Sequence, residues 1–118
     1  MAKIKEVISI TASTHNILAT GTQITGDICA EEDFRIDGTT IGNITCKGKI
    51  VIGTSGVVSG DIKCTNIEIL GRLDGNINCP GSVVLRASAL FTGNIISQTL
   101  EIEPGAKIEG TCSMYREE

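Results

Sequence analysis

Short runs of alternating apolar and polar residues follow one another along most of this chain, and glycine, asparagine or aspartate separates them. Residues 61–64 alternate, residues 65–66 turn the chain, residues 67–69 alternate again, and Leu73 stands shortly before Gly75. Alternation with a period of two is typical of a half-buried strand. Glycine and asparagine tolerate the left-handed backbone that tight corners need. Because helical periodicity is absent, the pattern predicts an all-β chain of short strands.

A three-residue phrase that begins with glycine recurs at intervals of 16, 18, 15, 18 and 17 residues. Its copies are Gly26-Asp27-Ile28, Gly42-Asn43-Ile44, Gly60-Asp61-Ile62, Gly75-Asn76-Ile77, Gly93-Asn94-Ile95 and the degenerate Gly110-Thr111-Cys112. A fixed period indicates stacked structural units, and each unit is too short to bury its apolar face alone. Since each period holds three short runs, we predict a three-sided parallel β-helix, a solenoid of about six coils.

The repeat also marks the predicted core. The middle runs of the periods lie at residues 34–36, 50–52, 67–69, 83–85 and 100–102. Single apolar residues before the next glycine lie at Ile41, Val58, Leu73, Phe91 and Ile108. Aromatic residues make up only 3% of the chain, so the core must be built from isoleucine, valine, leucine, alanine and cysteine.

The length of 118 residues is enough for one domain. We expect a flexible N-terminal tail over residues 1–16, a β-helix domain over residues 17–112 and a short C-terminal tail over residues 113–118. The N-terminus lacks the apolar segment and cleavage site of a signal peptide, and no apolar run is long enough for a transmembrane helix. The expected location is therefore the cytoplasm. The net charge of −4 and the scattered basic residues argue against nucleic-acid binding.

Three of the five cysteines are expected to align. Cys46, Cys64 and Cys79 each fall four residues after a phrase glycine, and Ser97 holds the same place in the next period. This alignment predicts a column of thiols, which could bind a soft metal or act as small apolar filler. Filler is favoured, because neighbours about 4.8 Å apart in a straight row do not easily form a tetrahedron and no histidine joins them.

The other two cysteines stand at different places in the repeat. Cys29 stands one residue out of phase with the three aligned cysteines. We therefore expect it to face outward as the most reactive thiol. Cys112 replaces the isoleucine of the phrase and is expected to be filler as well. No CxxC pair occurs, so free thiols are expected in a reducing cytoplasm, and no cofactor or metal is expected.

Two classes of β-helix enzyme match the sequence poorly. Hexapeptide-repeat acyltransferases need an apolar residue every six positions and a catalytic histidine on the coil, whereas the steps here vary and the single histidine, His15, lies before the repeat. Polysaccharide-active β-helix enzymes use carboxylate pairs but are longer and carry large substrate loops, for which the regular steps leave no room. No phosphate-binding GxxxxGK motif occurs, so nucleotide-driven assembly is not indicated.

The sequence features that indicate a function lie at the two ends of the predicted stack. The terminal coils there are as apolar as the interior ones. Their apolar residues are Ile17, Leu18 and Ile24 in the first coil and Leu100, Ile102 and Ile108 in the last. Solenoids usually protect their ends with polar capping repeats, and no capping helix is visible. Open strand edges over an exposed apolar core are templates for end-to-end stacking, which produces a filament when the contact repeats. Alternatively, the terminal segments fold back as caps and leave a monomer.

The chain resembles the bactofilins, which are polymer-forming bacterial cytoskeletal proteins. The stretches that carry the resemblance are residues 22–28 (TQITGDI), 34–38 (FRIDG), 48–53 (GKIVIG) and 100–106 (LEIEPGA). The resemblance covers about residues 16–114. It implies a right-handed three-sided β-helix whose members assemble end to end into filaments without a nucleotide, and these filaments are typically non-polar. It also implies a scaffold in cell shape, envelope growth or polarity that recruits cell-wall enzymes.

The resemblance further implies a membrane-binding segment at the N-terminus. Here Ile4, Val7 and Ile8 are the candidate membrane contacts, at the inner face of the cell membrane, although the family's aromatic-plus-lysine signal is not clearly present. Members tend to place phenylalanine before the final glycine, where it supports polymerisation, and this chain has Ile108 there.

We therefore predict a bacterial cytoskeletal scaffold, not an enzyme, that forms a homopolymer through its terminal coils. The alternatives are a monomeric β-helix adaptor and an acyltransferase-like β-helix enzyme.

Overall fold

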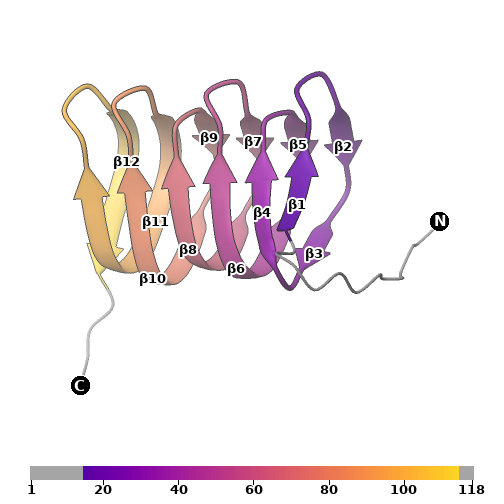
Figure 1. Cartoon of the computed structure of the whole chain (residues 1–118). Helices are drawn as coiled ribbons and strands as arrows, with labels where there is room; N and C mark the ends of the chain where they lie inside the picture. Colours follow the sequence, from indigo (N-terminus) through magenta and orange to yellow (C-terminus); the bar gives the residue numbers. More distant parts are fainter. Residues whose placement is uncertain (1–14, 115–118) are drawn as a thin grey trace.

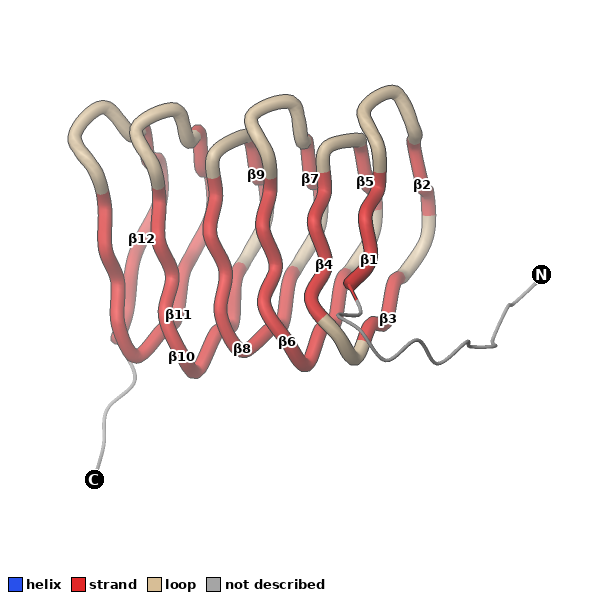
Figure 2. Tube along the Cα trace, viewed as in Figure 1, coloured by secondary structure: helices blue, strands red, loops and turns tan. Residues whose placement is uncertain are grey.

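The computed structural model describes residues 15–114, and this part of the chain is an all-β stack without a helix (Figures 1 and 2). Its strands are β1 (His15–Leu18), β2 (Gln23–Thr25), β3 (Ile28–Ala30), β4 (Asp33–Ile36), β5 (Thr39–Ile41), β6 (Ile44–Ile52), β7 (Val57–Ser59), β8 (Ile62–Ile69), β9 (Arg72–Asp74), β10 (Ile77–Leu85), β11 (Leu90–Ile102) and β12 (Lys107–Met114). All the pairings between these strands are parallel. The predicted parallel β-solenoid is confirmed.

The strand segments stack in three columns, and each coil adds one segment to every column. The first column holds β1, β4 and residues 49–52, 66–69, 82–85 and 99–102. The second column holds β2, β5, β7, β9 and residues 90–92 and 107–109. The third column holds β3 and residues 44–46, 62–64, 77–79, 95–97 and 112–114. In Figure 1 the first column faces the viewer and the second lies behind it.

Each column has one segment for each of six coils, as the glycine phrase predicted. The right-handed, three-sided winding stays a prediction. The strands begin at His15 and end at Met114, because these residues still pair with Asp33 and Ser97 of the neighbouring coils. They therefore extend two residues beyond each of the expected domain limits at residues 17 and 112.

Stacked apolar side chains of like shape fill the interior. The first column contributes the buried residues Ile36, Ile52, Ile69 and Leu85. The second contributes Val58, Leu73 and Phe91, and the third contributes Ile44, Ile62, Ile77 and Ile95. Burial of each such side chain stabilises the fold by about 1.5–3 kcal/mol before the entropy of ordering is subtracted. The interior is mostly the aliphatic core that the composition predicted, with the aromatic Phe34 and Phe91 buried in it as well.

One predicted core position is wrong, because Ile41 is exposed and its neighbour Thr40 is buried instead. Thr40 is in register with Val58, and Val58, like Leu73, stands two residues before its phrase glycine. Ile41 stands directly before Gly42, so the alternation of the strand points its side chain outward. The hydroxyl of Thr40 consequently lies in the interior without a hydrogen-bond partner.

Replacing Thr40 by valine is expected to stabilise the fold. Valine has nearly the same shape and lacks the hydroxyl, whose unpaired burial has a cost, so we expect a gain of about 1 kcal/mol in the free energy of unfolding. Urea unfolding followed by circular dichroism measures this gain. As a control, Ile41→Val on the exposed side should change the value by less than about 0.5 kcal/mol. A clear loss of stability in Thr40→Val would contradict the assignment.

The glycine phrase forms the corner between the second and third columns. In the first four copies, the residue after the glycine accepts a hydrogen bond, through its side-chain Oδ1, from the backbone N–H of its counterpart in the next coil. These bonds run from Asn43 N to Asp27 (3.1 Å), Asp61 N to Asn43 (3.1 Å), Asn76 N to Asp61 (3.2 Å) and Asn94 N to Asn76 (3.2 Å). They satisfy backbone donors at a point where regular strand pairing is interrupted, which explains the recurrent asparagine or aspartate.

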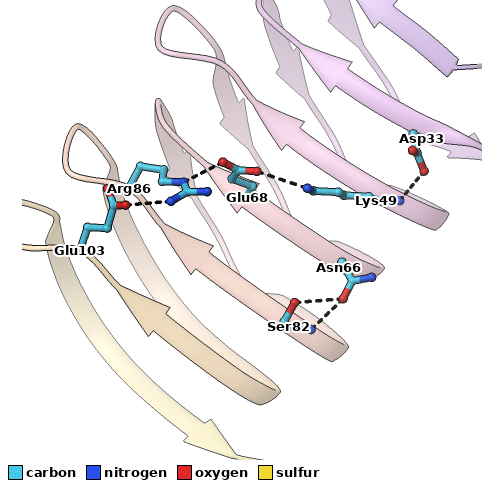
Figure 3. Close-up of polar contacts among 7 residues, drawn as sticks. All are labelled: Asp33, Lys49, Asn66, Glu68, Ser82, Arg86 and Glu103. Atoms are coloured by element: carbon cyan, nitrogen blue, oxygen red, sulfur yellow. Dashed lines mark hydrogen bonds and ion pairs between the residues drawn. The ribbon is translucent and has the colours of Figure 1, made fainter.

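Charged side chains on and beside the first column are paired from coil to coil (Figure 3). Arg86 Nε donates to Glu68 at 2.7 Å, and Arg86 Nη1 donates to Glu103 at 2.8 Å. Lys49 Nζ lies 3.3 Å from the other oxygen of Glu68. The hydrogen bonds from Arg86 and then Lys49 hold the pKa of Glu68 below its usual value. These bridges link four successive coils on one side of the stack.

The predicted thiol column is confirmed, since Cys46, Cys64 and Cys79 are buried in the third column and the buried Ser97 follows them. Interaction with Cys79, together with burial, raises the pKa of Cys64, and burial raises the pKa of Cys46. Both thiols therefore stay protonated at neutral pH. Within residues 15–114, no group of three or more histidine, cysteine, aspartate or glutamate side chains could hold a metal ion.

The two remaining cysteines are both exposed. Cys29 faces outward as predicted, because its neighbour Ile28 occupies the inward position in register with Ile44. Cys112 was expected to be interior filler, and this is wrong for the single chain. Its register partner Ile95 is buried, whereas no further coil covers Cys112.

Candidate functional site

The last coil carries an apolar layer that the stack leaves uncovered. Its inward positions continue the buried core columns and hold Leu100, Ile102, Ala106, Ile108, Cys112 and Met114. Ile102 is 46% exposed, whereas Leu85, its register partner one coil earlier, is fully buried. Likewise Met114 is 51% exposed, and its partner Ser97 is fully buried. The same inward geometry thus gives burial inside the stack and exposure at its end.

The first coil forms the other end of the stack. Its inward positions hold Leu18, Ile24, Ile28 and Ala30. Leu18 is 7% exposed, while the other three are partly buried against the core. This end therefore exposes less apolar surface than the last coil does.

Both ends also present open strand edges. In the described part of the chain, β12 pairs only with β11, and β2 pairs only with β5. The outer edges of these strands carry backbone N–H and C=O groups that a further strand could pair with. Figure 1 shows the two ends on opposite sides of the stack, with β12 at one end and β2 and β3 at the other.

Five of the six residues predicted for an end contact lie in these two layers. They are Leu18 and Ile24 at the first coil and Leu100, Ile102 and Ile108 at the last. Ile17 differs, because it is in register with the outward-facing Arg35 and is 61% exposed. It lies at the rim of the first coil and lines a side groove together with Asp33 and Val51.

Several end-layer residues escaped the sequence prediction. They are Ile28, Ala30, Ala106, Cys112 and Met114. Ile28 and Cys112 hold the third place of the glycine phrase, so an alignment of the phrase copies would have placed them inward. The candidate membrane contacts Ile4, Val7 and Ile8 lie outside the described residues.

Three acidic side chains on the sides of the stack are held in hydrogen bonds that belong to the fold. A side groove of about 360 Å³ contains Asp61 together with Lys63 and Asn76. However, Asp61 Oδ1 accepts the hydrogen bond of the Asn76 backbone N–H at 3.2 Å, as part of the corner ladder. Glu68 and Glu103 both hold Arg86. No helix in the described part of the chain is long and apolar enough to cross a membrane.

Comparisons with known proteins agree with this geometry. The family model for bactofilin, described as polymer-forming cytoskeletal, matches residues 16–113. The protein bactofilin BacO of Myxococcus xanthus (strain DK1622) is 36% identical over 63 residues, which is 53% of this chain and 50% of that protein. The chain thus spans about half the length of that relative.

Two solved structures are also similar, both of bactofilin from Thermus thermophilus. The crystal structure of a phenylalanine-to-arginine mutant is 30% identical with a TM-score of 0.72, covering 75% of this chain and 99% of that one. A cryo-EM reconstruction of its double helical filaments is 30% identical with a TM-score of 0.81, covering 85% of this chain and 99% of that one.

Proposed function

The chain belongs to the bactofilin family of polymer-forming cytoskeletal proteins, and from that premise we propose that it is a bacterial cytoskeletal scaffold that self-assembles end to end. The filaments form without a nucleotide or a metal and support cell shape or envelope organisation. Chains stack through their terminal coils, so the contact continues the core columns and the strand ladder from one subunit to the next.

The observation that carries this proposal is the uncovered apolar layer of the last coil. Ile102 and Met114 stand in register with fully buried residues, yet each has about half of its surface in water. At about 25 cal/mol per Å² of apolar area removed from water, a few hundred Å² at each end favours assembly by several kcal/mol before association entropy is subtracted. A solenoid with two such ends gains most by stacking on further copies.

The relative from Thermus thermophilus supports the same reading, since its filaments have been reconstructed and its subunit fold matches this chain. Bactofilins are structural proteins, and we assign no catalytic activity to this chain. We place it in the cytoplasm, with cell-wall enzymes as candidate partners and Ile4, Val7 and Ile8 as the candidate contacts with the inner membrane surface.

Electron microscopy of the purified chain in negative stain, with no nucleotide or metal added, tests the proposal. We expect long thin filaments that persist after treatment with a chelator, because the contact is apolar. Discrete particles at high protein concentration would contradict end-to-end assembly and favour a capped monomeric adaptor.

A further inference from the structure

Two thiols of the buried cysteine column lie on neighbouring coils and line the same side groove. Cys46 belongs to β6 and Cys64 to β8, which are adjacent in the stack (Figure 1), and the two residues are partners in register. A groove of about 320 Å³ beside this column is lined by both cysteines together with Lys47 and Lys63. The thiols are therefore nearly buried, yet a small ion can reach them from the side of the stack.

The third thiol of the column is held more firmly by the backbone. Cys79 donates to the carbonyl of Thr65 at 3.1 Å and to the carbonyl of Ser82 at 3.4 Å. Cys46 makes one bond of this kind, to the carbonyl of Glu32 at 3.3 Å. Cys79 is also fully buried and does not line the groove. The two thiols that the groove reaches are thus the ones with fewer backbone bonds to lose.

The spacing of Cys46 and Cys64 fits a bridging ion better than a disulfide. Side chains in register on parallel strands point the same way, so their Cβ atoms keep the strand spacing of about 4.8 Å. A disulfide needs these atoms about 3.8 Å apart, so the two coils would have to be pinched together. A metal–thiolate bond is about 2.3 Å long, as for zinc, so an ion in line between two sulfurs needs them about 4.6 Å apart. The stack thus supplies the spacing of a linear site with two sulfur ligands.

The ligands select the class of ion. Thiolates are soft ligands that favour Cu(I), and monovalent ions such as Cu(I) and Ag(I) are stable with two ligands in line. Zinc takes four ligands in a tetrahedron. Among the residues that the structure describes, no cluster of three or more histidine, cysteine, aspartate or glutamate side chains could supply them. The straight row that argues against zinc therefore favours a soft monovalent ion.

The charges beside the groove suit such an ion. A coordinating thiol loses its proton, so two thiols and one Cu(I) ion give an S–Cu–S unit with one negative charge and release two protons. Lys47 and Lys63 line the groove, and their ammonium groups belong to no ion pair within residues 15–114. They can offset the negative charge, whose burial would otherwise be costly.

From these observations we propose that Cys46 and Cys64 form a binding site for one soft monovalent ion of the Cu(I) class, held in line between their two thiolates. The bound ion links the second coil to the third through side chains and stabilises their contact. The site uses neither end of the stack, so it is independent of the proposed end-to-end assembly, and its test needs no filament.

Silver binding to the full-length chain tests the site, because Ag(I) is a soft ion that is stable in air. The exposed thiols are first removed by Cys29→Ser and Cys112→Ser. This background is dialysed against silver nitrate in chloride-free buffer that contains an excess of a monothiol competitor, and bound silver is measured. We expect one silver ion per chain, since two fixed thiolates hold an ion more tightly than separate monothiols do.

Alanine variants in the same background identify the ligands. Cys46→Ala and Cys64→Ala should each lower the silver affinity at least about tenfold, because even the loss of an outer partner of a metal ligand commonly costs that much. The matched control Cys79→Ala removes the next thiol of the column and should change the affinity less than about twofold. Alanine and serine already occupy this place in the fold, at Ala30 and Ser97. Circular dichroism checks folding, and the serine variant replaces any alanine variant that fails to fold.

The coordination itself is measured by X-ray absorption of the background loaded with Cu(I). Two sulfur neighbours are expected, and three or four would contradict a linear site. The absence of retained silver, or an unchanged affinity in Cys64→Ala, would overturn the proposal. A loss in Cys79→Ala with none in Cys46→Ala would show that the assignment of Cys46 as a ligand is wrong.

Discussion

Replacing Ile108 by arginine is expected to abolish filaments while leaving the coil stack folded. Ile108 occupies an inward position of the last coil, in register with the buried Phe91, and only the end of the stack leaves it partly exposed. In a single chain the arginine can extend into water, so the strand spectrum should not change. In a stacked pair the same guanidinium would be buried without a partner, which costs about 3–5 kcal/mol. The subunit concentration needed for assembly should therefore rise more than about 100-fold.

Sedimentation and electron microscopy of Ile108→Arg measure this effect, and circular dichroism reports the fold. The matched control is Thr99→Arg, which places the same side chain at an exposed, outward position of the same coil. Thr99→Arg should assemble like the unmodified chain. Filaments of normal length in Ile108→Arg would show that the last coil does not form the end contact.

Replacing Gly75 by alanine should destabilise each subunit far more than the same replacement at Gly26. Gly75 has a φ of 152° and lies at a corner of the fourth coil. A Cβ there would collide with the backbone carbonyl oxygen of Gly60 in the preceding coil, and backbone atoms cannot turn aside as a flexible side chain can. Because the substitution combines a strained backbone with a direct clash between coils, we expect a loss of about 3–5 kcal/mol in the free energy of unfolding.

The matched control for Gly75→Ala is Gly26→Ala. Gly26 holds the same place in the first coil with a similar positive φ of 130°, but a Cβ there meets nothing within 4 Å, since no coil precedes it. The difference between the two variants isolates the clash between stacked coils from backbone strain. Both are measured by thermal unfolding in the Ile108→Arg background, so that single subunits unfold. Equal losses would show that close approach of the coils is not the reason for the glycine.

Several features of the molecule follow from the sequence by itself. The recurrent glycine phrase predicted the stack of six coils, because a solenoid repeats one local pattern and each coil contacts only its neighbours. The alternation within each run predicted strands and a buried thiol column. The absence of a polar capping repeat pointed to the ends, where the structure places an apolar layer on the last coil.

Tertiary structure alone decided which of two alternating sets faces inward where both contain apolar residues. Around Ile17 the neighbouring Leu18 leaves either choice open, and pairing with the next coil turns Ile17 outward. Around Ile41 the local pattern favours the wrong residue, because the inward position is held by the polar Thr40. Tertiary structure also decided that Cys112 is exposed although its register is inward, because burial needs a further coil and not only an inward direction. The ion pairs of Glu68 and Arg86 likewise depend on which residues the stacking brings together from different coils. Local sequence sets the strands and corners, whereas burial and pairing are properties of neighbouring coils.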